Sequence, residues 1–117
     1  MQQVVLGNKV VGSSTPTLIV AEIGNNHDGS MGQARSLIDA ALECRVDAVN
    51  FQTHITDEEM LPHSPKPSHF PEPRYQFVRR MEWSEEQHRE LKAYGEAKGL
   101  LFYSTPIALA TGLSSQL

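Results

Sequence analysis

Several side chains that could do chemistry are gathered in one short segment, Glu22-Ile-Gly-Asn-Asn-His-Asp-Gly-Ser30. The segment overlaps the end of an apolar run, 17–23, which is rich in β-branched residues and too short for a typical helix. The run is therefore predicted to be a buried parallel strand. In α/β folds, chemistry concentrates at the carboxyl ends of parallel strands and in the loops that follow them. This segment is the first candidate for an active site.

Within the segment, Glu22 and His27 are the candidate catalytic residues. A carboxylate can accept a hydrogen bond from a hydroxyl group or help to move a proton at a reacting carbon. We favour this role for Glu22 over a structural pairing, because an unpaired charge that ends a buried strand is costly. His27 could shuttle a proton or orient Glu22, although a hydrogen bond that fixes the loop explains it at least as well. Gly24 and Gly29 permit the positive φ angles that a tight turn requires.

The elements that must position these side chains follow a strand, helix, strand order. Ser30 and Gln33 have capping-box spacing, so a helix is predicted to begin near Met31. A second strand is predicted at 47–52, and the short joints indicate a right-handed βαβ unit. The apolar positions of the helix recur at one-face spacing; they are Ala34, Leu37, Ile38, Ala41 and Leu42.

The remaining elements follow the same alternation. A short helix is predicted at 75–81, and Ser84 with Gln87 begins a second capped helix that runs to about Lys98. Gly99 occupies the position at which a left-handed residue commonly ends a helix. A third strand is predicted at 100–104. Ahead of all these elements, Gly7-Asn8 between two β-prone runs predicts an N-terminal hairpin.

A long segment, 53–74, breaks the pattern and contains five of the seven prolines of the chain. Loops of this length in compact domains are usually functional or disordered. The segment leaves the sheet at the same end as the Glu22 loop. A substrate lid and a surface excursion without function are both open.

Composition excludes several classes of function. The 117 residues suffice for one small domain, and 39% hydrophobic residues allow a globular core. A net charge of −4 without a run of Lys or Arg argues against a nucleic-acid or anionic-membrane surface. No apolar run approaches the roughly 20 residues of a membrane span. The only cysteine, Cys44, cannot form an internal disulfide, which fits a cytoplasmic location.

Three stretches, each at a predicted strand end, together suggest a family. They are Ala21-Glu-Ile-Gly-Asn-Asn-His-Asp-Gly-Ser30, Asp47-Ala-Val-Asn-Phe-Gln-Thr-His54 and Leu101-Phe-Tyr-Ser-Thr-Pro106. In order and spacing the chain resembles the N-terminal part of the sialic acid synthase family, which includes N-acetylneuraminate, legionaminate and pseudaminate synthases. The resemblance covers nearly all of the chain up to Pro106. It implies an α/β fold, namely the first three βα units of a TIM (β/α)8 barrel, with hairpin and linker at 1–16, βα units at 17–106 and a weakly patterned tail at 107–117.

The resemblance also implies an activity. Family members condense phosphoenolpyruvate with an N-acyl amino sugar such as N-acetylmannosamine, and phosphate leaves by C–O cleavage after water attacks the enol carbon. Mn²⁺ or Mg²⁺ polarises the sugar aldehyde, and the metal ligands are expected outside this chain. The full-length enzymes are expected to be homodimers with a C-terminal antifreeze-like domain.

Further substrate-binding residues are implied by position in the family motifs. Asn25 and Asn26 belong to the loop motif, and Gln52 matches a residue that contacts the amino sugar. Ser104 and Thr105 match a pair that follows the third strand, where the threonine helps to hold phosphoenolpyruvate. Structural roles are the alternatives to substrate binding. Gln52 could simply be a polar residue that ends a strand, and Ser104 and Thr105 could form a turn in which Pro106 ends the strand.

Two positions depart from the family pattern. Asn50 stands where the family usually has a lysine that binds the phosphate of phosphoenolpyruvate, and an amide can donate a hydrogen bond but brings no charge. Cys44-Arg45 stands where the family closes the first helix with a small residue and a glycine. If Arg45 keeps the left-handed conformation, it costs roughly 1 kcal/mol relative to glycine.

The other histidines, His54, His63, His69 and His88, match no metal-ligand spacing and are predicted to be solvated. The stripe of Leu91 and Tyr94 is interpreted as core packing.

Length leaves an alternative function open. A complete barrel needs about 250 residues, so the chain is expected to be a fragment or a truncated reading frame that is inactive alone. A non-catalytic remnant or sugar-binding module is therefore the runner-up. A 3-deoxy-sugar-acid synthase is a weaker third hypothesis, because the loop 25–29 argues against it.

Overall fold

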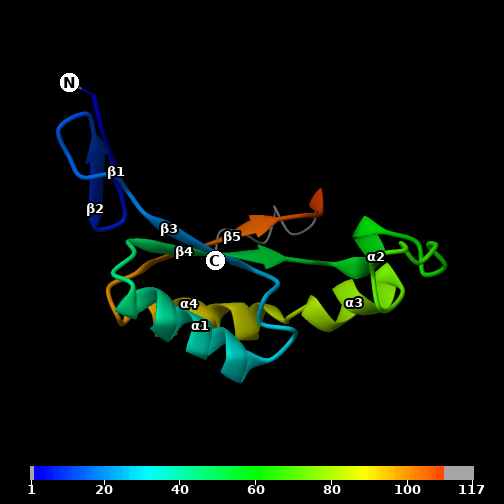
Figure 1. Ribbon diagram of the computed structural model, residues 1–117. Coiled ribbons are helices and arrows are strands. Elements are labelled where there is room, and N and C mark those ends of the chain that lie inside the picture. Colours follow the sequence, from blue (N-terminus) through cyan, green and yellow to red (C-terminus); the bar gives the residue numbers. More distant parts are fainter. Residues whose placement is uncertain (1, 110–117) are drawn as a thin grey trace.

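The computed structural model describes residues 2–109, so the predicted tail lies outside it from residue 110 onward. Within this range none of the helices is long and apolar enough to cross a membrane. Figure 1 shows the elements in chain order. They are β1 (Gln3–Leu6), β2 (Lys9–Gly12), β3 (Val20–Gly24), α1 (Met31–Glu43), β4 (Ala48–Thr53), α2 (Thr56–Glu59), α3 (Arg74–Met81), α4 (Glu85–Glu96) and β5 (Leu101–Pro106).

A parallel three-stranded sheet in the order β3-β4-β5 organises the chain. The register pairs Glu22 with Asn50 and Gln52 with Thr105, so the carboxyl ends of the three strands lie at one edge. Helices α1 and α4 cover one face of this sheet (Figure 1). The predicted α/β fold with parallel strands is confirmed.

The core lies between the sheet and these two helices. Its strand members alternate with residues of the other face, as the two-residue period of a strand requires. The buried cluster consists of Ile23, Ala34, Ile38, Ala41, Val49, Phe51, Trp83, Leu91 and Leu100, with Tyr94 and Phe102 packed against it. The core role of Leu91 and Tyr94 is therefore confirmed, and so is the predicted helix face except for Leu42, which is exposed at the end of α1.

The opposite face of the sheet is not covered by helices within residues 2–109. Val20 and Glu22 are exposed on it, and Tyr103 is 46% exposed. The prediction that 17–23 is a buried strand is therefore wrong for Val20 and Glu22. The strand also begins later, at Val20, because the N–H of Ile19 donates to the Asp47 carboxylate (2.9 Å) instead of to a strand carbonyl.

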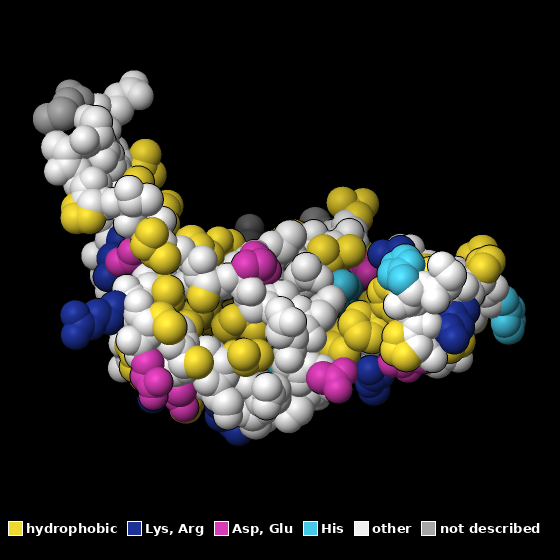
Figure 2. All heavy atoms as spheres, in the orientation of Figure 1, with side chains coloured by type: hydrophobic (Ala, Val, Ile, Leu, Met, Phe, Trp, Pro, Cys, Tyr) yellow, Lys and Arg dark blue, Asp and Glu magenta, His cyan; other side chains and the backbone are white. Residues whose placement is uncertain are grey.

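The N-terminal hairpin is confirmed. β1 and β2 pair antiparallel, and the hairpin rises from the amino end of the parallel sheet (Figure 1). Hydrophobic side chains gather below it in the space-filling view (Figure 2). They line a groove of about 390 Å³ whose members include Leu6, Leu18, Ala48, Leu101 and Tyr103. The amino end of the open face is thus apolar.

Both capped helices begin where the sequence predicts. Ser30 Oγ accepts the N–H of Gln33 (3.1 Å) at the start of α1, and a complete capping box begins α4. α1 ends at Glu43, and Arg45 beyond it has a φ of 58°. Arg45 therefore does adopt the left-handed conformation, at a cost of about 1 kcal/mol relative to glycine.

The proline-rich segment is more ordered than predicted. Residues 56–59 form the one-turn helix α2, and Thr56 donates through its N–H (3.0 Å) and its hydroxyl (2.7 Å) to Glu82 Oε2. This long-range contact has no signal in local sequence. The prediction of an unstructured loop over 53–74 is wrong for this part.

The loop after β3 is packed against the end of α3. Trp83 Nε1 donates to the carbonyl of Gly29 (3.3 Å), and Arg80 pairs with Asp28 (3.1 Å). A Cβ atom on Gly29 would lie only 2.5 Å from the carbonyl oxygen of Arg80. With φ angles of 53° and 79°, Gly24 and Gly29 confirm the predicted positive-φ positions.

Candidate active site

Three candidate residues come together at the carboxyl edge of the sheet. They are Glu22 on β3, Asn50 on β4 and Thr105 on β5. Side chains alternate between the two faces of a strand, and the core residues of these strands point toward the helices. The three candidate residues therefore lie on the face that the helices leave open. Parallel pairing brings them side by side although 83 positions separate the first from the last along the sequence.

Asn50 bridges the other two residues. Its Nδ2 donates to Glu22 Oε2 (2.6 Å) and to Thr105 Oγ1 (3.1 Å), and the Thr105 hydroxyl donates to Asn50 Oδ1 (3.2 Å). Asn50 is 7% exposed, whereas Glu22 and Thr105 are exposed. Glu22 Oε1 has no hydrogen-bond partner among residues 2–109 and is free to accept one from a ligand. We call this set the carboxylate cluster.

A second network lies beside the carboxylate cluster. Asn25 Nδ2 donates to Gln52 Oε1 (2.9 Å) and lies 3.0 Å from His54 Nε2, and His54 Nε2 lies 3.2 Å from Gln52 Oε1. On the other side of the ring, His54 Nδ1 lies 3.0 Å from both carboxylate oxygens of Glu59. We call Asn25, Gln52, His54 and Glu59 the amide network.

The two sets meet at Gly24. A Cβ atom on this residue would lie 3.4 Å from Glu22 Oε1 and 3.6 Å from Gln52 Nε2. The free carboxylate oxygen and the amino group of the glutamine therefore both border Gly24. A register irregularity between Glu22 and Gly24 accompanies this approach, as β-bulges near functional sites often do.

Three of the predicted site residues are not brought into either set. Asn26 is exposed, and its Nδ2 donates to the Ile23 carbonyl (2.8 Å) so that it closes the turn after β3. Ser104 lies on the helix side of β5, where its Oγ is 2.6 Å from Thr53 Oγ1. The prediction that Ser104 acts beside Thr105 did not allow for the alternation of a strand, which sends neighbours to opposite faces.

His27, the third of these residues, is fully buried in the core. Its ring stacks on Trp83 at 3.9 Å between centroids, and Nδ1 accepts the N–H of Gly29 (3.0 Å). The Nε2 atom has no partner among the described residues. His27 therefore makes no hydrogen bond to Glu22, and its contacts support the alternative role of fixing the loop.

The surroundings of His27 keep its ring neutral. Burial lowers the pKa of His27 from 6.5 to about 4, and the neighbouring His54 and His88 contribute to this lowering. Burial, and then His54, also lower the pKa of His88, whose Nε2 likewise has no partner in the described part of the chain. A ring that stays neutral at pH 7 and faces apolar groups is not placed for proton transfer.

The prediction of solvated histidines is wrong for two of the four. His54 and His88 are 5% and 6% exposed, whereas His63 and His69 are exposed. Sequence reasoning missed His54 and Glu59 as site residues. The available signal was the motif His54-Ile-Thr-Asp-Glu-Glu-Met60, in which one turn of helix places Glu59 back against the histidine ring.

Whether the described residues could bind a divalent metal ion depends on which side-chain donor atoms lie close together. Mn²⁺ and Mg²⁺ prefer oxygen-rich sites with several carboxylates or imidazoles in common reach. No group of three or more His, Cys, Asp or Glu side chains within residues 2–109 could hold a metal ion. The described residues do not fit such an ion.

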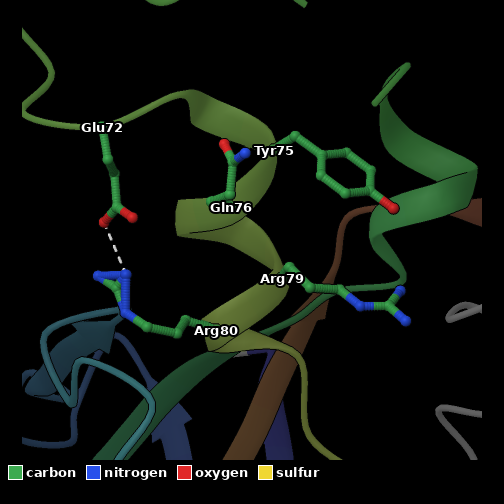
Figure 3. Close-up of a pocket in the computed structure, with 5 residues that line it drawn as sticks. All are labelled: Glu72, Tyr75, Gln76, Arg79 and Arg80. Atoms are coloured by element: carbon green, nitrogen blue, oxygen red, sulfur yellow. Dashed lines mark hydrogen bonds and ion pairs between the residues drawn. The ribbon is translucent and has the colours of Figure 1, made fainter. Parts of the chain in front are cut away.

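Two cavities lie beyond the ends of the strands, and only the first includes a residue of the site. One of about 310 Å³ is lined by Glu59, Arg74, Ile107 and prolines of the 61–73 segment, so that segment reaches the amide network. Figure 3 shows the other, along α3. Its two arginines are already paired, Arg79 with Asp57 (3.3 Å) and Arg80 with Glu72 (2.6 Å), so it offers no unpaired positive charge to an anion.

Comparisons with known proteins agree with the motifs. The sequence profile of the NeuB family matches residues 37–112. The uncharacterized protein MJ1065 of Methanocaldococcus jannaschii is 36% identical over 109 residues, which cover 93% of this chain and 30% of that protein. An N,N'-diacetyllegionaminic acid synthase of Legionella pneumophila is 35% identical over 109 residues, with 85% of this chain and 30% of that protein covered.

A solved structure agrees as well. The crystal structure of N-acetylneuraminic acid (sialic acid) synthetase from Leptospira borgpetersenii serovar Hardjo-bovis, in complex with citrate, superposes with a TM-score of 0.83 at 26% identity. The match covers 98% of this chain and 38% of that one. The chain thus spans about a third of the length of the relatives that it matches.

Proposed function

Because the chain belongs to the NeuB family, we propose that it supplies part of the active site of an N-acetylneuraminate-type synthase. In this proposal the complete protein condenses phosphoenolpyruvate with an N-acyl amino sugar, such as N-acetylmannosamine, to a nonulosonic acid and releases phosphate. The reaction is a transferase step in carbohydrate biosynthesis.

The observation that carries the proposal is the convergence of the carboxylate cluster and the amide network at one edge of the sheet. Glu22, Asn50, Gln52 and Thr105 were selected from sequence motifs. Asn50 bonds to both Glu22 and Thr105, and Gln52 and Glu22 both lie within 3.6 Å of the position that a Cβ atom on Gly24 would take, which supports the proposal. Uncharged donors and acceptors around one free carboxylate oxygen suit a neutral polyol.

We assign Glu22 to the reacting end of the amino sugar. Its Oε1 can accept a hydrogen bond from a hydroxyl or hold a proton there, while the bond from Asn50 keeps Oε2 in place. Thr105 and Asn50 are assigned to phosphoenolpyruvate, which they would bind through hydrogen bonds alone. Charge-assisted bonds are about twice as strong, so binding at this point is expected to be weaker than with a lysine at position 50.

For the fold, we propose that the three strands are the first βα units of a (β/α)8 barrel. The uncovered face of the sheet would then face the barrel interior, and the hairpin would lie at its amino end. The apolar groove at that end and the polar clusters at the carboxyl end match the division in barrels between stability and chemistry. The proline-rich segment, which lines a cavity with Glu59, is proposed as a substrate lid.

The remaining components are proposals from the family alone. Mn²⁺ or Mg²⁺ would be held by ligands outside residues 2–109, and the complete protein would act as a homodimer. No step assigned to Glu22, Asn50 or Thr105 depends on the metal.

The test is an assay of the complete gene product with phosphoenolpyruvate, Mn²⁺ and a panel of N-acyl hexosamines. We expect phosphate release that depends on one of these sugars. Phosphate release with none of them would reject the synthase assignment.

A second candidate, a sugar-binding protein without turnover, is favoured by one observation. Asn50 replaces the expected lysine, and its amide is already satisfied by Glu22 and Thr105. Titration calorimetry with the same sugars separates the two functions, because a binding protein would show heat of sugar binding without release of phosphate.

A further inference from the structure

Glu59 fixes which nitrogen of His54 carries the hydrogen. Both carboxylate oxygens lie 3.0 Å from His54 Nδ1, and Oε1 also accepts the N–H of Ile55 (3.0 Å). The side chains of His54 and Glu59 are only 6% and 7% exposed. An ionised carboxylate only accepts hydrogen bonds, so Nδ1 must be the donor.

The other nitrogen of His54 acts on two amides. Nε2 lies 3.0 Å from Asn25 Nδ2, 3.1 Å from Asn25 Oδ1 and 3.2 Å from Gln52 Oε1. With a second hydrogen on Nε2 the ring donates to Asn25 Oδ1 or Gln52 Oε1, and with one hydrogen, on Nδ1, it accepts from the amino group of Asn25. The same amino group donates to Gln52 Oε1 at 2.9 Å. The carbonyl oxygen of Gln52 is therefore held toward Asn25 and His54.

The amino group of Gln52 must then point the opposite way. It lies on the side of Gly24, because a Cβ atom added to that glycine would be 3.6 Å from Gln52 Nε2 and 3.4 Å from Glu22 Oε1. One donor from Gln52 and one acceptor from Glu22 thus both lie next to Gly24. A glutamine turned over by half a rotation would present two acceptors there instead.

We propose that His54 is a positioning residue that, held by Glu59, orients the Gln52 amide so that its amino group donates to an oxygen of the acceptor sugar. The nature of the ligand rests on the function proposed above. The orientation of the amide rests only on the contacts of the amide network, so the two can fail separately.

The orientation is tested by nitrogen NMR of the complete gene product, labelled with nitrogen-15 on histidine and glutamine side chains, without substrate. We expect His54 to carry its hydrogen on Nδ1. In Glu59→Gln the carboxylate is lost, and we expect a mixture of tautomers with shifted side-chain amide signals of Gln52. The matched control is Glu58→Gln, because Glu58 is an exposed residue of the same one-turn helix.

The consequence for the ligand is tested by kinetics. We expect Glu59→Gln to raise KM for the amino sugar about tenfold, the loss of roughly one hydrogen bond, while KM for phosphoenolpyruvate stays within about twofold. In His54→Gln the side-chain amide reaches the position of Nε2, whereas in His54→Asn it reaches only the position of Nδ1. We therefore expect His54→Gln to retain more of the sugar affinity of the unmodified protein than His54→Asn.

Several results would overturn the proposal. A hydrogen on Nε2 of His54 with none on Nδ1 in the unmodified protein would do so, as would unchanged ring and Gln52 signals in Glu59→Gln. An equal rise of both KM values, or a loss of thermal stability alone, would show a purely structural role. If the protein has no synthase activity with any sugar, the NMR arm still decides the orientation, and only the proposed function is rejected.

Discussion

Two groups of buried histidines show how the same side chain takes different roles according to its neighbours. His54 lies among polar groups, and both of its ring nitrogens have partners. His27 and His88 pack around Trp83, and the Nε2 atom of each has no partner in the described part of the chain. All three rings are nearly inaccessible to solvent, so burial alone does not separate them.

This difference in hydrogen-bond partners separates polar side chains that can bind a ligand from polar side chains that pack in the core. On the open face of the sheet, hydrogen bonds hold Asn25, Gln52 and His54 in place, while the amino group of Gln52 has no partner among residues 2–109. On the covered face, the imidazole rings pack against Trp83 as aromatic side chains do, and burial there favours their neutral form. Substitutions should therefore affect activity on the first face and stability on the second.

The largest expected effect concerns the covered face and pH. The pKa of folded His27, about 4, lies below its ordinary value of 6.5, so the unfolded chain binds more protons between these values. Stability contributed by the neutral ring is complete above pH 6.5 and is lost as pH falls toward 4, by about 3 kcal/mol in total. Denaturant unfolding of the complete gene product at several pH values measures this loss.

A matched pair of variants isolates the contribution of His27. His27→Asn keeps an acceptor for the N–H of Gly29 but cannot titrate, so its unfolding free energy should depend less on pH than that of the unmodified protein. His63→Gln, at an exposed position, should leave the pH dependence unchanged. Equal slopes in all three proteins would mean that the buried ring is not the titrating group.

The next effect concerns the open face. Glu22→Gln removes the proton-accepting oxygen but keeps the shape of the side chain, and we expect kcat to fall about 100-fold with little change in stability. Glu43→Gln, at the exposed end of α1, is the control. Steady-state phosphate release measures both. Retained turnover in Glu22→Gln would remove this residue from the chemistry.

Asn50→Lys sharpens the comparison by adding a charge to the open face. The lysine can pair with Glu22 in place of the amide, and we expect phosphoenolpyruvate to bind about tenfold more tightly because its bond becomes charge-assisted. Calorimetry with phosphoenolpyruvate gives the affinity, and the amino sugar serves as the reference ligand. No gain would argue that position 50 does not touch phosphate.

The smallest effect lies outside both faces, at the end of α1. Arg45→Gly should raise the unfolding free energy by about 1 kcal/mol, because Arg45 holds a φ of 58° that glycine adopts without strain. Gly99→Ala is the reverse test, since Gly99 has a φ of 84° and open space around its Cβ position; it should lose a similar amount. Changes of the same sign in both would contradict the strain argument.

Local signals predicted the elements of the fold well. The hydroxyls of Ser30 and Ser84 cap α1 and α4 as expected, because capping depends on residues three positions apart. The same holds for the left-handed Gly99. The part that failed depended on distant partners: α2 is held by Glu82, 26 positions after Thr56, and local sequence carries no sign of that bond.

The site was predicted in part for the same reason. Glu22, Asn50 and Thr105 follow from strand ends that parallel pairing must bring together. Ser104 was predicted beside Thr105 at the site, but its position in the motif does not show on which face of the strand its side chain lies, and it lies on the helix side of β5. The burial of His54 and His88 depends on how the segment after β4 folds back and on how α4 packs against the core, and both are tertiary events.

The tight approach of Gly29 to the Arg80 carbonyl has a mechanical consequence. With no room for even a methyl group between them, the turn that supplies Asn25 and the end of α3 must travel as one rigid piece. If the protein closes over its substrates, the bending has to take place within residues 61–73, because α2 before them and α3 after them both belong to this piece through the Thr56–Glu82 and Asp57–Arg79 contacts.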